Sequence, residues 1–220
     1  ATESVFRLAT ERLPAMVSDP GSAAIEQAGS PDTWGKLNTA IIVDLDETIL
    51  DNSYYQARQI RAGAEYDESS WQLWMQEAAA TAVPGAVEFL QAASRAGHRV
   101  FYITNRACAP LPSIDDPCPA KTATRKNLQR LGLPDADDPD ALMLRGAHPE
   151  WRTSNKTSRR TWVASRYRVI ALFGDDLNDF MPRADYAKRR TEFADFFGRR
   201  WFLRPNPIYG SWERVLLGGV

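Results

Sequence analysis

Residues 40–48 read Ala40-Ile41-Ile42-Val43-Asp44-Leu45-Asp46-Glu47-Thr48, four apolar residues followed by two aspartates that are two positions apart. A continuous apolar run, in contrast to an alternating one, is typical of a strand buried on both faces of a parallel sheet. The carboxylates would then lie at the carboxyl end of that strand, where open α/β sheets bind their ligands. The stretch therefore predicts a buried parallel strand that delivers an acidic pair to a functional site.

Three further apolar runs have the same form and also end at polar residues: Val100-Phe101-Tyr102-Ile103 before Thr104, Ala141-Leu142-Met143-Leu144 before Arg145, and Val169-Ile170-Ala171-Leu172-Phe173 before Gly174-Asp175. Helices are expected between the runs, over residues 84–96, 123–131 and 154–166. The first has Pro84 at its start and Gly97 just after its end, the usual polarity of helix punctuation. Strands that alternate with helices predict an α/β fold, a doubly wound parallel sheet of Rossmann-like type.

The segment 52–83 interrupts this alternation directly after the first predicted strand. It carries Trp71, Trp74 and Met75 at helical spacing, so we expect a smaller helical cap over the site. A further helix is expected over residues 4–16, and the segment after residue 204 is rich in turn residues. The predicted division is a core of residues 36–51 and 84–204, with residues 1–35, 52–83 and 205–220 forming the cap and the terminal segments.

A second acidic cluster, Gly174-Asp175-Asp176-Leu177-Asn178-Asp179, follows the last apolar run. The acidic pair Asp44 and Asp46 would repel unless a cation lay between the two carboxylates or one of them kept its proton. Hard oxygen ligands favour Mg²⁺ over Zn²⁺. Asp is common in turns, so one cluster alone is explained by a solvated loop; two clusters at equivalent strand ends favour a metal site.

Four stretches resemble, in this order, the four motifs of the haloacid dehalogenase (HAD) superfamily: Asp44-Leu45-Asp46-Glu47-Thr48, Thr104, Lys156 and Gly174–Asp179. Flanking residues make the chain similar to bacterial class C acid phosphatases, notably Ile103-Thr104-Asn105-Arg106, Lys156-Thr157-Ser158-Arg159-Arg160 and Pro205-Asn206-Pro207-Ile208-Tyr209. The resemblance covers residues 40–213 and implies a HAD-like sheet with a cap. Asp176 departs from the family pattern, which has Asn or Thr there.

The resemblance implies a phosphomonoesterase that forms an aspartyl-phosphate on Asp44, with Asp46 as general acid and base. Thr104 and Lys156 would hold the phosphoryl oxygens. The implied Mg²⁺ ligands are Asp44, Asp46 through its backbone carbonyl, Asp175 and Asp179. The second aspartate of the first motif favours ester hydrolysis, because the dehalogenases of the superfamily lack it and the ATP-driven pumps have Thr there.

Aromatic residues indicate nucleoside 5′-monophosphates among the substrates, because relatives stack the base between aromatic rings and such stacking contributes about 1–3 kcal/mol per base. By motif position the candidates are Tyr55 and Tyr209, with Asn52 and Asn105 as further substrate-binding candidates. Asn52 has the alternative role of bracing the loop after the first motif. For the two cap tryptophans the alternative is a purely structural role as the buried stripe of the cap.

Two other features keep alternative interpretations. Arg159 and Arg160 are expected on a solvated helix face or in ion pairs, as is usual for charge runs. Cys108 and Cys118 are either two free thiols or the ends of a loop-closing disulfide in an oxidising compartment.

The charges nearly cancel, with 27 Lys and Arg against 28 Asp and Glu, which argues against a nucleic-acid polymer as partner. No apolar run approaches the length of a transmembrane helix. The resemblance implies a secreted or periplasmic protein, or one associated with the outer membrane of bacteria. The expected form is the mature chain without a signal peptide. The resemblance also permits a homodimer.

The function predicted from the sequence is a Mg²⁺-dependent acid phosphatase acting on small phosphomonoesters. The alternative is a non-catalytic storage or binding protein on the same scaffold. Asp44 disfavours that alternative, because such relatives have lost the nucleophile.

Overall fold

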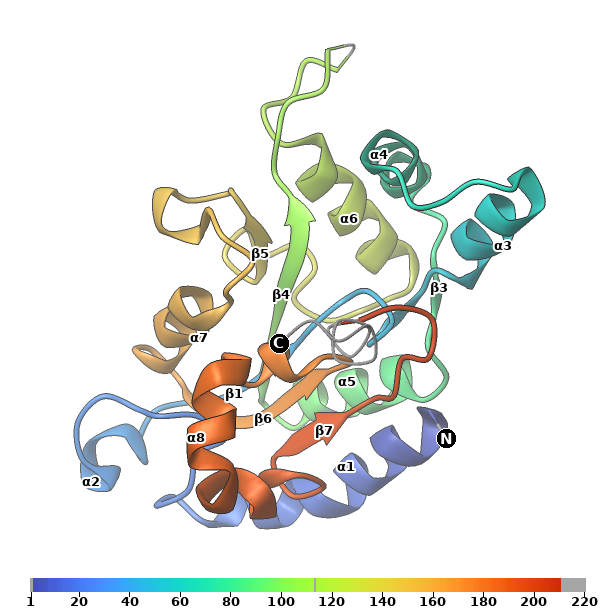
Figure 1. Ribbon diagram of the computed structural model, residues 1–220. Coiled ribbons are helices and arrows are strands. Elements are labelled where there is room, and N and C mark those ends of the chain that lie inside the picture. Colours follow the sequence, from blue (N-terminus) through green and yellow to red (C-terminus); the bar gives the residue numbers. More distant parts are fainter. Residues whose placement is uncertain (1, 113, 211–220) are drawn as a thin grey trace.

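The computed structural model describes residues 2–112 and 114–210. At its centre is a five-stranded sheet in the order β5-β4-β1-β6-β7 (Figure 1). All neighbouring strands in it are parallel. The strands are β1 (Thr39–Val43), β4 (Arg99–Ala107), β5 (Leu142–Arg145), β6 (Arg168–Gly174) and β7 (Trp201–Leu203). The α/β fold with a parallel central sheet is confirmed, and β7 is an addition that the sequence did not predict.

Both faces of the sheet are covered, which explains why the strand sequences are continuously apolar. In β1, Ile41 and Val43 belong to one hydrophobic cluster, whereas Ala40 and Ile42 belong to another. The first cluster lies between the sheet and the helices α1 (Thr2–Ser18), α5 (Ala86–Arg95) and α6 (Pro119–Arg130). The second lies under α7 (Thr157–Ala164) and α8 (Arg183–Phe193).

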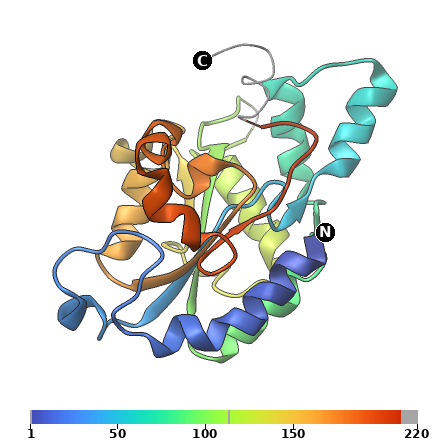
Figure 2. The same ribbon diagram turned by 60° about the horizontal axis from the view of Figure 1, so that its bottom comes forward.

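The N-terminal helix is a terminal segment that packs on the core. The α1 helix lies alongside α5 and contacts β6 and β7 (Figure 2). Phe6 of α1 stacks on Phe173 at 5.4 Å between ring centroids, and Phe89 of α5 lies 5.0 Å from the same ring. Burying an aromatic side chain of this size contributes roughly 1.5–3 kcal/mol, so these contacts fix α1 beneath the sheet.

The cap consists of α3 (Ser53–Ala62) and α4 (Glu68–Glu77), so the expected helical insertion is present. It is joined to the core by a short antiparallel pair, β2 (Leu50–Asp51) and β3 (Thr81–Ala82). Trp74 and Met75 are buried, as the structural interpretation of the stripe predicts. Trp71 is only partly buried and differs from them in its role, as described below.

Short elements complete the chain: α2 (Pro31–Trp34) and the 3-10 turns η1 (Pro149–Trp151), η2 (Leu177–Asp179) and η3 (Ala194–Phe196). A disulfide joins Cys108, directly after β4, to Cys118, directly before α6. The structure therefore has the bridge and not two free thiols. None of the helices in the described ranges is both long enough and apolar enough to span a bilayer.

Candidate active site

The candidate site lies where the strand order reverses. From β1 the chain moves outward through β4 and β5, then returns to the other side of β1 with β6 and β7. The crevice beyond β1 and β6 is therefore a topological switch point, the usual ligand site of such sheets. Asp44 directly follows β1 and Asp175 directly follows β6, so the two carboxylates flank this crevice.

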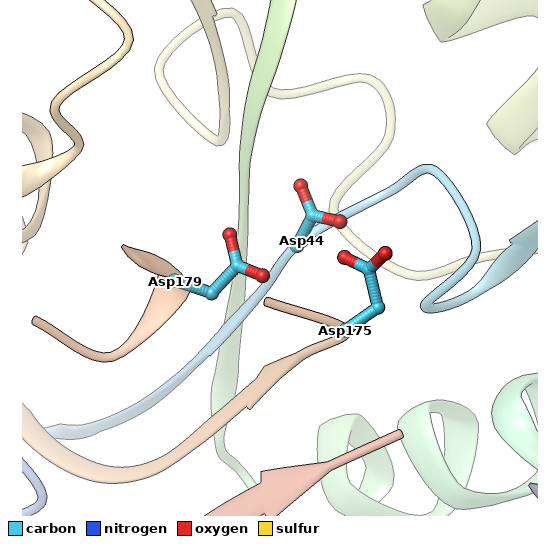
Figure 3. A group of neighbouring side chains, drawn as sticks. All are labelled: Asp44, Asp175 and Asp179. Carbon is cyan, nitrogen blue, oxygen red and sulfur yellow. The ribbon is translucent and has the colours of Figure 1, made fainter. Parts of the chain in front are cut away.

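Three carboxylates converge there. Asp44, Asp175 and Asp179 each offer one oxygen, and these oxygens all lie within 4.8 Å of one another (Figure 3). Lys156, at the start of α7, places its Nζ 2.5 Å from Asp44 Oδ1 and 2.6 Å from Asp179 Oδ1. The Thr48 hydroxyl donates to Asp44 Oδ2 at 3.0 Å. Three carboxyl groups thus lie close together, and Lys156 contacts two of them, those of Asp44 and Asp179.

This excess of negative charge is visible in the pKa values. Burial raises the pKa of Asp44 to about 7, against the opposing effect of Lys156. Burial also raises the pKa of Asp175 to about 9, and the neighbouring Asp179 and Asp44 add to the increase. Three carboxylates this close together, with one oxygen each facing the others, are suited to a divalent cation with hard oxygen ligands, so the donor set fits Mg²⁺.

The second acidic loop is shaped by local contacts. A Cβ atom on Gly174 would lie 2.3 Å from Asp179 Cβ, so only glycine allows the loop to fold back this closely. Asp176 accepts a hydrogen bond from the Asn178 backbone N–H at 2.9 Å, and Asp179 accepts one from the Asp176 N–H at 3.0 Å. The unusual Asp176 therefore caps η2, although it also lines the cavity.

Asp46 is held by residues to which the sequence analysis gave no role or an uncertain one. Arg106 donates to both of its oxygens, with the shortest contact at 2.7 Å. Asn52 Nδ2 donates to Asp46 Oδ1 at 3.0 Å, and Asn52 Oδ1 accepts from Trp74 Nε1 at 2.8 Å. Asn52 is completely buried, so it braces the loop after the first motif, the second of its two predicted roles.

Arg159 and Arg160 correct the expectation of a solvated helix face. Both are buried, at 0% and 4% exposed. Arg159 donates to the Thr104 carbonyl at 2.5 Å and to Asn105 Oδ1 at 2.8 Å. Arg160 donates to the carbonyls of Asn178 and Asp179 at 3.0 and 2.9 Å. The sequence showed a charge run but not that these two arginines donate to residues of β4 and η2, three of them through backbone carbonyls.

A cavity of about 620 Å³ opens over these groups. It brings together most of the predicted residues, namely Asp44, Asp46, Thr104, Asn105, Lys156, Asp175, Asp179 and Tyr209. Tyr55 is not among its lining residues: it is 2% exposed, and its hydroxyl pairs with Ser70 Oγ inside the cap at 3.0 Å. The aromatic residues that the cap does present to the cavity are Tyr66 and Trp71.

Two further polar residues were missed as contributors. Asn206, after β7, donates to Asp175 Oδ2 at 2.8 Å. Arg106 lies in the stretch Ile103–Arg106, which carries part of the family resemblance, but that resemblance assigned it no role.

Four features together define a HAD-like fold: the sheet order, the aspartate pair after the central strand, the lysine at the start of α7 and the second acidic loop. The chain belongs to the HAD superfamily, subfamily IIIB (acid phosphatase), whose family model matches residues 21–212.

Solved structures of a class C acid phosphatase from Bacillus anthracis are similar over nearly the whole chain. The form with tungstate bound has a TM-score of 0.78 at 29% identity, covering 100% of this chain and 82% of that one. A second structure of that enzyme has a TM-score of 0.77 at 29% identity, covering 98% of this chain and 80% of that one.

Plant proteins are also similar. Acid phosphatase 1 of Solanum lycopersicum is 27% identical over 84% of this chain, and the stem 31 kDa glycoprotein of Glycine max is 21% identical over 78%. The aligned parts cover 64% and 59% of these two proteins, so the chain spans less than two thirds of their length.

Proposed function

We propose that this protein is a Mg²⁺-dependent phosphomonoesterase that works through an aspartyl-phosphate on Asp44. The observation that carries the proposal is the surroundings of Asp44 at the floor of the cavity. Lys156 contacts its carboxylate directly, and Asp175 and Asp179 lie within 4.8 Å as potential metal ligands. Asp46, two residues further on, also lines the cavity. The pattern supports phosphoryl transfer to a carboxylate followed by hydrolysis.

The reaction is derived from these side chains. Asp44 attacks the phosphorus atom of the ester while Thr104 and Lys156 hold the phosphoryl oxygens. As the ester P–O bond breaks, its electron pair goes to the leaving oxygen, which takes a proton from Asp46. Asp46 then takes a proton from water, whose oxygen attacks the phosphorus atom and releases inorganic phosphate from Asp44. When bound by Asp44, the carbonyl of Asp46, Asp175 and Asp179, Mg²⁺ would neutralise charge on the phosphoryl group.

Nucleoside 5′-monophosphates are the substrate class that we favour. Tyr209 lines the cavity from the segment after β7, and Trp71 and Tyr66 line it from the cap. Aromatic faces on both sides of a cavity suit a base, because stacking is favourable for any base. Trp71 and Tyr66, in place of Tyr55, are therefore the cap residues that we propose to stack on the base.

A secreted location fits the Cys108–Cys118 disulfide, because such bridges persist in oxidising compartments. Titration of thiols in the denatured protein without reductant would yield none under this proposal and two if the cysteines are free. A homodimer stays a proposal that rests on the resemblance and is checked by light scattering.

The function is tested by measuring phosphate release from 5′-nucleotides, 3′-nucleotides, sugar phosphates and an aryl phosphate, with Mg²⁺ and with EDTA. Metal-dependent release that is lost in Asp44→Asn supports the mechanism. The matched control is Asp137→Asn, which alters an exposed carboxylate on the loop before β5. No release from any ester by folded wild-type protein with Mg²⁺ would overturn the proposal and favour the storage or binding alternative.

A further inference from the structure

The buried ion pair between Arg106 and Asp46 is the strongest feature of the site that the mechanism above does not use. The Arg106 side chain is 2% exposed and that of Asp46 17%. Arg106 Nη2 lies 2.7 Å from Asp46 Oδ1, and Nε lies 3.1 and 3.0 Å from Oδ1 and Oδ2. A guanidinium holds a carboxylate in one orientation through such a fork, which a lysine ammonium cannot reproduce.

Arg106 is itself fixed by three elements. It is part of β4, and its backbone N–H donates to Thr104 Oγ1 at 3.1 Å. Its Nη1 donates to Thr124 Oγ1 of α6 at 3.0 Å, where Thr124 is completely buried. Its guanidinium carbon lies 5.7 Å from the centre of the Trp71 ring on α4 of the cap. The guanidinium therefore connects the sheet, α6 and the cap at one point of the cavity wall.

The hydrogen bonds distinguish the two oxygens of Asp46. Oδ1 accepts from Arg106 Nη2 and Asn52 Nδ2, which use its two lone pairs, and the single hydrogen of Arg106 Nε lies between Oδ1 and Oδ2. Among the hydrogen bonds of the described residues, Oδ2 accepts only from Arg106 Nε, at 3.0 Å. Oδ2 is therefore the oxygen with capacity for a proton.

We propose that Arg106 is a positioning residue that reserves Oδ2 of Asp46 for the proton given to the leaving group. This inference rests on the proposed function, because it assigns a role within that reaction. As the ester P–O bond breaks, the proton passes from Oδ2 to the leaving oxygen and Arg106 stabilises the carboxylate that remains. Without the fork, Asp46 rotates and proton transfer fails first for esters whose leaving group cannot depart as an anion.

The test compares kcat/KM for two substrates that differ in their need for a proton. The leaving group of para-nitrophenyl phosphate departs without protonation, whereas glycerol 2-phosphate has an alkoxide leaving group that requires it. Removing a general acid costs roughly 10²–10⁴-fold. For Arg106→Lys and Arg106→Gln we expect a loss of roughly 10²-fold on glycerol 2-phosphate and of less than about 10-fold on para-nitrophenyl phosphate.

Two further variants separate positioning from folding. Thr124→Val removes the hydrogen bond that orients Arg106 but leaves the ion pair, so it is expected to shift the substrate ratio in the same direction by a smaller factor. Arg58→Lys is the control, since Arg58 lies 5.4 Å from the Trp74 ring on the cap but pairs with Glu77 in an exposed position. In Arg106→Ala, added guanidinium restores turnover of glycerol 2-phosphate, whereas methylammonium does not.

The possible outcomes keep the two proposals apart. Wild-type protein that hydrolyses neither ester with Mg²⁺ would overturn the proposed function itself. If the wild-type protein is active and the Arg106 variants lose kcat/KM by the same factor on both esters, the positioning role is overturned. The phosphatase proposal would still stand in that case.

Discussion

Replacing Gly174 by alanine tests how the second acidic loop is built. The added Cβ would lie 2.3 Å from Asp179 Cβ and 2.4 Å from Asp179 Oδ2, so Asp179 has to move. Overpacking of this kind costs about 1–3 kcal/mol. For a chain of this size each kcal/mol lowers Tm by about 2–4 °C, so we expect a decrease of roughly 2–12 °C. The displaced carboxylate would also leave Lys156 and weaken Mg²⁺ binding.

The assay is thermal unfolding of Gly174→Ala with and without Mg²⁺, together with calorimetric titration of Mg²⁺. Gly21→Ala is the matched control, because its Cβ would meet only Asp19 Oδ1 at an ordinary 3.4 Å. We expect the control to retain the wild-type Tm within a few degrees and the wild-type Mg²⁺ affinity. A Gly174→Ala protein with unchanged Tm and unchanged Mg²⁺ affinity would refute the reasoning.

Three further predictions concern pH, the pocket and the buried arginines. Without metal, the folded protein keeps protons on Asp44 (pKa about 7) and Asp175 (pKa about 9) that the unfolded chain releases near pH 4. The free energy of unfolding, measured with urea in EDTA, should therefore fall as the pH rises from about 4 to 9, and Mg²⁺ should oppose this loss. A constant free energy of unfolding across that range would contradict the prediction. Tyr209→Ala should raise the KM for a nucleoside 5′-monophosphate roughly 10-fold and leave the KM for para-nitrophenyl phosphate nearly unchanged. An equal change in KM for both substrates would argue against stacking of the base on Tyr209. Arg160→Met should weaken Mg²⁺ binding more than Arg166→Met, which alters an exposed arginine just after α7. Equal affinities in calorimetry would exclude a role for Arg160 in holding the metal loop.

The four longer strands of the central sheet were predictable because burial on both faces leaves a continuous apolar signature. β7 was not, since a strand of three residues beginning at Trp201 carries too little pattern. The two-residue strands that join the cap to the core escaped prediction for the same reason.

The carboxylates and Lys156 of the site were predictable because motif spacing places them at strand ends and at a helix start. The orientation of cap side chains was not. Tyr55 and Trp71 pack edge to face at 5.0 Å, and only the tertiary position of the cap decides which of them meets the cavity. Likewise, a sequence shows that Arg159 is charged but not that its guanidinium donates to the Thr104 carbonyl of β4.

The disulfide has a consequence for engineering. Its two Cα atoms are 4.8 Å apart, and the bridge closes the segment between Cys108 and Cys118 at its base. The two supports of Arg106 that belong to the core, in β4 and α6, lie outside that closed segment. The nine residues within the covalent ring are thus a natural insertion point, where an epitope or an immobilisation tag can be grafted without changing the strand register behind it.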